Sequence, residues 1–152
     1  ARFDGRRCAT GTPPTSELRL EVQRSMQGHC AVFRTGDLMQ EGRDRLTALW
    51  AKNDDIEVND TSLIWNSDLA ETLEYDNLLA QGVVSLDSAL NRKESRGGHA
   101  REDYPDRDDE NWMKHTYAWL NEDGTTRIDY RPVHEETLTN DVQAIPPKER
   151  VY

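Results

Sequence analysis

The residues best suited to chemistry lie between positions 91 and 116, where arginines and histidines alternate with carboxylates around two adjacent glycines. Guanidinium groups bind carboxylates through paired hydrogen bonds, so Arg96 and Arg101, with His99 between them, could form an anion-binding set. The nearby acidic residues could instead neutralise these cations internally. We favour a structural ion-pair or interface network, whose candidate members are Arg92, Glu94, Arg96, His99, Arg101, Glu102, Asp103, Arg107 and Asp108.

Other chemistries are poorly supported by the spacing of reactive residues. The acidic run at 106–110 lacks the alternating acids, glycine and later glutamate of a calcium loop. His134 precedes two glutamates, but Leu138 stands where a zinc motif needs a second histidine. Ser95 lies outside a nucleophile-elbow pattern, and Cys30 falls on an apolar helix face. We therefore predict no catalytic, metal-binding or cofactor-binding residue in this chain.

Apolar residues recur at three- and four-residue intervals before the charged stretch, which predicts amphipathic helices. The expected apolar positions, in chain order, are Leu18, Val22, Met26, Cys30, Phe33, Leu38, Met39, Leu46, Leu49, Trp50, Leu69, Leu73, Leu79, Val83, Leu86 and Leu90. Burying these stripes together predicts an antiparallel three-helix bundle over residues 15–93. Residues 1–14, which contain Gly and Pro and lack periodicity, are expected to form a linker.

The chain changes character after the predicted helices. Residues 114–120 and 127–133 alternate on either side of an Asp-Gly turn, which predicts a β-hairpin with a connection longer than two residues. Pro146 and Pro147 stiffen what we expect to be an extended C-terminal tail. The predicted fold class is mainly α: residues 94–152 form a charged loop, a β-hairpin and a tail that pack on the bundle as one domain.

The four tryptophans are expected to divide between the core and an interface. Trp50 and Trp65 lie on or beside predicted helices and are assigned to packing. Trp112 and Trp119 flank the charged stretch and the hairpin, where aromatic side chains could meet another domain or subunit.

Composition narrows the classes of partner. The chain has 152 residues with 32% charged, 35% hydrophobic and a net charge of -10. This acidity disfavours nucleic acid and direct contact with an anionic membrane. The mean hydropathy of -0.92 fits a segment that shares polar surface with neighbouring domains, and equally a free-standing acidic helical interaction module. Cys8 and Cys30 lack CxxC spacing, which makes a reduced compartment the default expectation.

Several ordered motifs resemble the C-terminal region of the succinate dehydrogenase and fumarate reductase flavoprotein subunits. They are TSELRLEVQRSMQGHCAVFRTGD at 15–37, LIWNSDLAETLEYDNLL at 63–79, HAREDYPDRDD and NWMKHT at 99–116, and PPKERVY at 146–152. Several long motifs in one order are far more specific than a lone fingerprint. The resemblance is closest to succinate dehydrogenase, with fumarate reductase and L-aspartate oxidase as alternatives.

The resemblance implies a parent subunit that oxidises succinate to fumarate by hydride transfer to covalently held FAD. Electrons would then pass through an iron–sulfur subunit to quinone. The sequence lacks the G-x-G-x-x-G loop of a dinucleotide-binding domain, and the family's flavin-linking and substrate-binding residues belong to motifs upstream of the matched region. We therefore expect FAD to be bound by the parent subunit outside this chain, and the isolated chain to be inactive.

The same resemblance implies a structural role. The domain would brace the flavin-binding domain of the same subunit and contribute to assembly with the iron–sulfur subunit. The expected location is peripheral, through partner subunits, on the cytoplasmic face of the bacterial inner membrane or the matrix side of the mitochondrial membrane.

Overall fold

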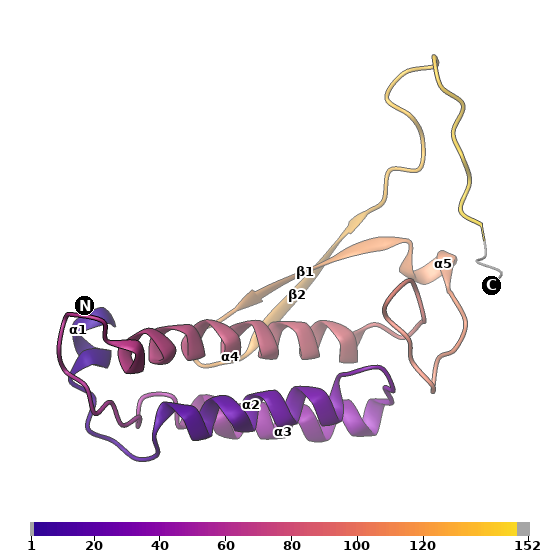
Figure 1. Cartoon of the computed structure of the whole chain (residues 1–152). Coiled ribbons are helices and arrows are strands. Elements are labelled where there is room, and N and C mark those ends of the chain that lie inside the picture. The colour runs from indigo at the N-terminus through magenta and orange to yellow at the C-terminus, as the bar shows by residue number, and fades with distance from the viewer. Residues whose placement is uncertain (1, 149–152) are drawn as a thin grey trace.

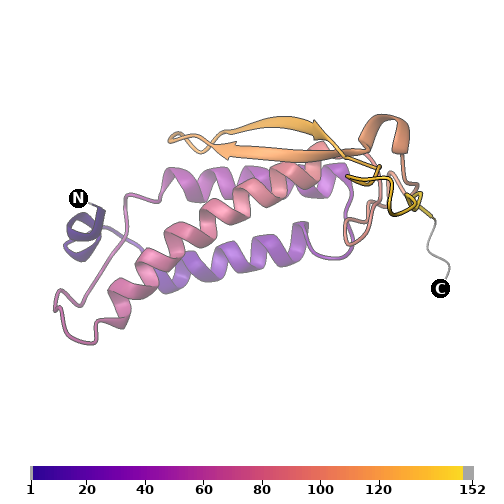
Figure 2. The same cartoon turned by 90° about the horizontal axis from the view of Figure 1, so that it is seen from above.

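A computed structural model describes residues 2–148. The elements, in chain order, are α1 (Arg2–Arg7), α2 (Thr15–His29), α3 (Gly36–Ala51), α4 (Ser67–Asn91), α5 (Asp109–Trp112), β1 (Lys114–Leu120) and β2 (Thr126–Pro132). The helices α2, α3 and α4 lie together, the hairpin lies over α4, and residues 133–148 extend away from the helices (Figure 1). Seen from above, α4 crosses obliquely over α2 and α3 (Figure 2).

Local sequence signals fix where the long helices begin. The Thr35 side chain accepts a hydrogen bond from the Leu38 N–H at the start of α3. The Asn66 side chain does the same for the Leu69 N–H at the start of α4. Such N-caps satisfy backbone donors that have no partner inside the helix.

The core forms where α2, α3 and α4 face one another. Its buried apolar residues include Leu18, Val22, Met39, Leu46, Leu49, Leu69, Tyr75, Leu79, Val83 and Leu86. The predicted mainly helical fold with a β-hairpin is therefore confirmed. Phe33 was wrongly assigned to the first apolar face, because α2 ends at His29 and the Phe33 side chain is exposed.

The N-terminal segment differs from the linker that we expected. Residues Arg2–Arg7 form α1, in which no residue is buried. Arg6 pairs with Asp76 of α4 at 2.9 Å, and Arg2 donates from Nε to the same carboxylate at 3.0 Å. Ion pairs, and not an apolar face, therefore attach α1, which is why apolar periodicity did not reveal it.

The hairpin is confirmed, with β1 and β2 antiparallel and Tyr117 opposite Asp129. Its longer connection docks on α3, since the Trp50 indole N–H donates to the Glu122 carbonyl at 3.3 Å. Gly124 has a positive φ of 78°, and a Cβ there would collide with the Trp50 indole. Glycine is therefore required at this position, and Trp50 packs as predicted.

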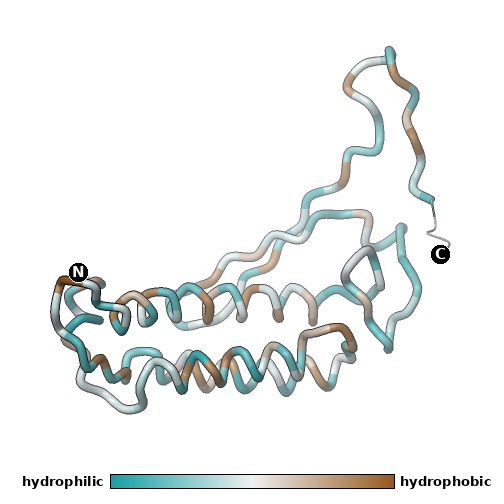
Figure 3. The backbone as a smooth tube through the Cα atoms, viewed as in Figure 1, coloured by the Kyte–Doolittle hydropathy of each residue, from teal (hydrophilic) through white to brown (hydrophobic). Residues whose placement is uncertain are grey.

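Apolar residues also lie outside the core (Figure 3). They occupy the α2–α3 turn, the α3–α4 connection and the tail, and the exposed ones are Val32, Phe33, Leu63, Ile64, Trp65, Leu138, Val142 and Ile145. The prediction that Trp65 packs in the core is wrong, because Trp65 lies in the connection before α4 begins. None of the helices within residues 2–148 combines the length and apolar character needed to span a bilayer.

Candidate functional site: the charged loop

The charged loop, residues 92–108, connects α4 to α5 and joins the ends of two helices. Arg101 is buried and donates from Nη1 to the Leu90 carbonyl at 3.0 Å and the Arg92 carbonyl at 3.2 Å, at the end of α4. Its other nitrogens pair with Asp103 at 2.6 and 2.7 Å, and Asp103 accepts from the Gly36 N–H at 2.8 Å. A cation at one helix C-terminus and an anion at another N-terminus complement both helix dipoles.

Glu94 is the centre of a second group and is fully buried. It accepts from Arg96 at 2.9 and 3.0 Å and from the Asp108 N–H at 2.9 Å, and it pairs with Arg92. Burial raises the pKa of Glu94, but the hydrogen bonds from Arg96, Asp108 and Arg92 outweigh burial, so the pKa lies below its ordinary value. The buried carboxylate is therefore ionised and matched by two guanidinium groups.

His99 lies between the two groups. Arg34 donates from Nη1 to His99 Nδ1 at 3.0 Å, and His99 Nε2 lies 3.3 Å from the Arg92 carbonyl. A guanidinium cannot accept a hydrogen bond, so the imidazole is neutral and carries its proton on Nε2. Burial lowers the pKa of His99, and the charges of Arg34, Arg101 and Arg92 lower it further. These contacts suit a structural histidine.

Protonation of His99 should therefore oppose folding. Its folded pKa lies below the ordinary 6.5, so the unfolded chain takes up the proton first as pH falls. We expect the free energy of unfolding to decrease below pH 6.5 in the native chain and to decrease less in His99→Gln. Urea denaturation above and below that pH measures the difference, with His134→Gln on the exposed tail as the control for loss of an imidazole. Identical pH dependence in the native chain and His99→Gln would contradict this account.

The two adjacent glycines form the turn that sets this geometry. Arg96 and His99 exchange both backbone hydrogen bonds, at 2.7 and 3.0 Å, across Gly97 and Gly98. Gly97 has a φ of 60°, and a positive φ confined to the first central residue is typical of a type II′ turn. The turn therefore places Arg96 and His99 opposite each other on the two segments of the loop that flank the glycines.

Two predicted members contribute differently from the rest. Glu102 is exposed and uses its backbone N–H, which donates to the Arg34 carbonyl at 2.8 Å. Arg107 pairs with Asp109 at 2.9 Å on the surface. The structure brings together the remaining predicted residues around Glu94, His99 and the Arg101–Asp103 pair.

Four contributors were missed by the sequence reasoning: Arg34, Gly36, Ser95 and Asp109. Arg34 and Gly36 lie on the α2–α3 turn and the start of α3, more than 60 residues from their partners. Local spacing carries no signal for such contacts. Ser95 could have been suspected as a loop hydroxyl, since its Oγ accepts from the Arg101 N–H at 2.8 Å and donates to the Tyr104 carbonyl at 2.8 Å.

Two pockets open beside the loop, of about 780 and 420 Å³. Arg96 lines both and is paired with Glu94 and with Asp109, at 2.6 Å for the latter. In the smaller pocket, Lys114 lies 4.7 Å from the Trp112 ring and 4.0 Å from the Tyr130 ring. These cations already have partners, which favours the structural network over the anion site considered as its alternative.

Comparison with known proteins shows the family to which this chain belongs. Residues 19–152 match the model described as fumarate reductase flavoprotein C-term. The chain belongs to this family. It is 54% identical to the succinate dehydrogenase flavoprotein subunit of Rickettsia conorii over 99% of this chain and 25% of that protein. It is 51% identical to the mitochondrial succinate dehydrogenase flavoprotein subunit of Oryza sativa subsp. japonica over 100% of this chain and 24% of that protein.

The solved structures agree. An E. coli quinol fumarate reductase mutant matches with a TM-score of 0.87 and 35% identity, over 99% of this chain and 25% of that chain. The chain therefore spans about a quarter of the length of the relatives that it matches. The resemblance inferred from the motifs is confirmed: this is the C-terminal domain of a flavoprotein subunit, and the charged loop is part of that domain.

Proposed function

We propose that the parent subunit of this domain oxidises succinate to fumarate with FAD and passes electrons to quinone. The observation that carries the proposal is the 54% identity, across 99% of this chain, to a succinate dehydrogenase flavoprotein subunit. Fumarate reductase is the second candidate, because the E. coli structure with a TM-score of 0.87 carries that name.

The domain itself is structural in this proposal. The helices α2, α3 and α4 act as an antiparallel three-helix bundle over residues 15–93, since each of them contacts the other two. Residues 94–152 supply the charged loop, the hairpin and the tail. The bundle holds the loop against the flavin-binding domain of the same subunit, and the iron–sulfur subunit is the expected second partner. The assembly is peripheral to the membrane, on its cytoplasmic or matrix side.

A surface beside the charged loop supports docking. Val32 and Phe33, each 73% exposed, form an apolar pair on the α2–α3 turn. The next residue, Arg34, is fixed by its hydrogen bond to His99 and by a 2.7 Å bond to the Ala31 carbonyl. The apolar pair is therefore held next to the network, and an exposed apolar pair of this kind would gain burial if a neighbouring domain covered it.

The parent activity is tested on the full-length subunit. We expect bound flavin in the visible spectrum and succinate-dependent reduction of a dye. Faster fumarate reduction than succinate oxidation would favour the second candidate. Absence of both flavin and turnover would overturn the proposed function.

The docking role predicts a specific phenotype for Arg96→Ala. The isolated chain should stay folded and lose less stability than Glu94→Ala, because Arg92 and the Asp108 N–H remain on Glu94. The full subunit should retain less flavin or assemble more weakly, as measured by the flavin-to-protein ratio after gel filtration. Arg127→Ala, on the exposed hairpin, is the matched control. A variant that unfolds the chain yet leaves the assembled subunit intact would contradict the role.

A further inference from the structure

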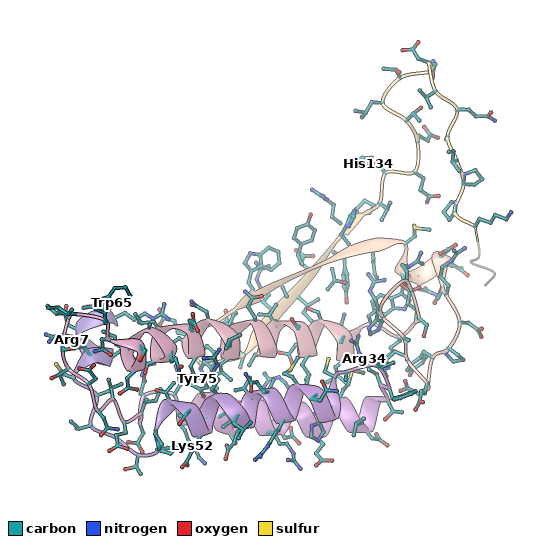
Figure 4. The ribbon with its side chains drawn as sticks, in the orientation of Figure 1. Arg7, Arg34, Lys52, Trp65, Tyr75 and His134 are labelled. Carbon is teal, nitrogen blue, oxygen red and sulfur yellow. The ribbon has the colours of Figure 1, made fainter. Side chains whose placement is uncertain are left out.

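The α3–α4 connection exposes three consecutive apolar side chains, here called the apolar tip: Leu63, Ile64 and Trp65. Their exposed fractions are 71%, 78% and 97%. Trp65 lies at the end of the molecule where α1 is found (Figure 4). Tryptophan is enriched among the residues that dominate interface energies, and contiguous exposed apolar residues mark contact surfaces.

Polar groups beneath the tip hold it in one conformation. The Asn66 amide donates to the Asp60 carbonyl at 2.6 Å and to the Ser62 carbonyl at 2.9 Å. The Asp68 carboxylate accepts from the Asn59 N–H at 2.7 Å and from the Asp60 N–H at 3.2 Å. The connection is thus ordered before any partner binds, which lowers the conformational entropy lost on docking.

The backbone of the apolar tip adopts a strained conformation at Trp65. Trp65 has a φ of 53°, in the left-handed region that bulky residues rarely adopt. Glycine would occupy this position without strain. The hydrogen bonds of Asn66 and Asp68 hold this conformation, which presents the large indole outward, where a contact could bury it.

The position of the tip identifies what covers it. Arg7 of α1 donates to the Thr61 carbonyl at 2.9 Å, which ties the N-terminal helix to the tip's own connection. The matched family region is C-terminal, and this chain spans about a quarter of its relatives' length. In a parent subunit of that kind, the upstream three quarters lead into α1 and pass next to the tip.

We propose that the apolar tip docks into an apolar pocket in the upstream part of the same polypeptide, with Trp65 as its anchor. This inference rests on the proposed function, which supplies the upstream part. The tip would lock the entry end of this domain, while the charged loop lies at the opposite end of α4 (Figure 1).

The test uses the full-length subunit with Ile64→Cys, which keeps the Trp65 anchor, and measures the rate of maleimide alkylation at that site by mass spectrometry. Protection is the alkylation rate in denaturant divided by the alkylation rate in the native subunit. Ala48→Cys, on the exposed side of α3, is the matched control. We expect about tenfold or greater protection at position 64 and less than about threefold protection at position 48.

Three results would overturn the proposal. Equal protection at the two positions would mean that the tip is uncovered. Protection that arises only when the iron–sulfur subunit is added would assign the tip to another subunit. Protection that grows with protein concentration would assign it to a second copy of the chain.

A second variant keeps the test decisive if Ile64→Cys fails to fold. Trp65→Gly removes the anchor and relieves the backbone strain, so we expect proteolytic cleavage between the upstream part and this domain to accelerate about fivefold or more. Unchanged cleavage would overturn the docking. Protection of Ile64→Cys in a subunit without flavin or succinate turnover would support the docking while contradicting the proposed function. An active subunit with an unprotected tip would contradict the docking alone.

Discussion

Glu94→Ala is expected to destabilise the chain by about 3 kcal/mol, because it removes a buried carboxylate, leaves the Asp108 N–H without its acceptor, and deprives the guanidinium of Arg92 of its ion pair. Arg92, Arg96 and the Asp108 N–H all converge on this carboxylate. In the variant, Arg96 keeps Asp109 as an ion-pair partner. Arg92 has no second carboxylate partner among residues 2–148. The free energy of unfolding from urea denaturation at neutral pH measures the loss.

Asp109→Ala is the matched control for this prediction. Asp109 also pairs with Arg96, but its carboxylate is partly exposed, so its removal should cost far less than the removal of Glu94. Comparable losses in Glu94→Ala and Asp109→Ala would show that the charged loop is solvated and that Glu94 does not organise it.

Arg101→Ala is expected to have an effect of similar size, about 3–5 kcal/mol. The variant leaves the carbonyls at the end of α4 without their side-chain donor and leaves Asp103 without its cation. The Gly36 N–H, which binds Asp103, should exchange its hydrogen faster at the start of α3. Urea denaturation and amide hydrogen exchange provide the two measurements.

The pH dependence of Arg101→Ala gives an independent check. The hydrogen bond from Arg101 lowers the pKa of Asp103 to about 2 from an ordinary value of 3.8. Stabilisation from this depressed pKa is fully present above pH 3.8 and is lost as pH falls through about 2, so the variant, in which only backbone N–H groups still lower the pKa of Asp103, should show a smaller acid-dependent loss. Arg101→Lys keeps the positive charge without the forked guanidinium, so its loss of stability should lie between those of the native chain and Arg101→Ala. An Arg101→Ala loss no larger than that of Arg127→Ala would contradict the account.

The elements with strong local signals could be predicted from the sequence. The predicted apolar positions repeat at helical spacing, and the buried ones include Leu18, Val22, Met39, Leu46, Leu69, Leu79, Val83 and Leu86. The hairpin followed from strand alternation around an Asp-Gly turn. In both cases the burial of side chains and the local backbone preference point to the same structure.

The remaining features depend on polar contacts. The helix α1 is attached by Arg2 and Arg6 to Asp76, about 70 residues away, and has no apolar repeat. Trp65 looked like a packing residue because it adjoins a helix, yet the Asn66 cap begins α4 after it and leaves it outside. Contacts between distant segments decided the first outcome, and a local helix cap decided the second.

For the charged loop, the sequence indicated the kind of network but not which carboxylate pairs with which arginine. Its composition indicated an internally neutralised network, but Glu102 and Asp103 were equally plausible partners for Arg101. The turn at Gly97 and the contact with Gly36 decide between them, because they direct Asp103 inward and leave Glu102 exposed.

The most direct measurement for the central claim uses the purified chain alone. It is incubated with FAD, freed of unbound flavin, and assayed for visible flavin absorbance and for succinate-dependent dye reduction. A structural C-terminal domain whose arginines are satisfied internally predicts no retained flavin and no turnover. Retained flavin or succinate oxidation would contradict the account and would point to Arg96, His99 and Arg101 as the first residues to replace.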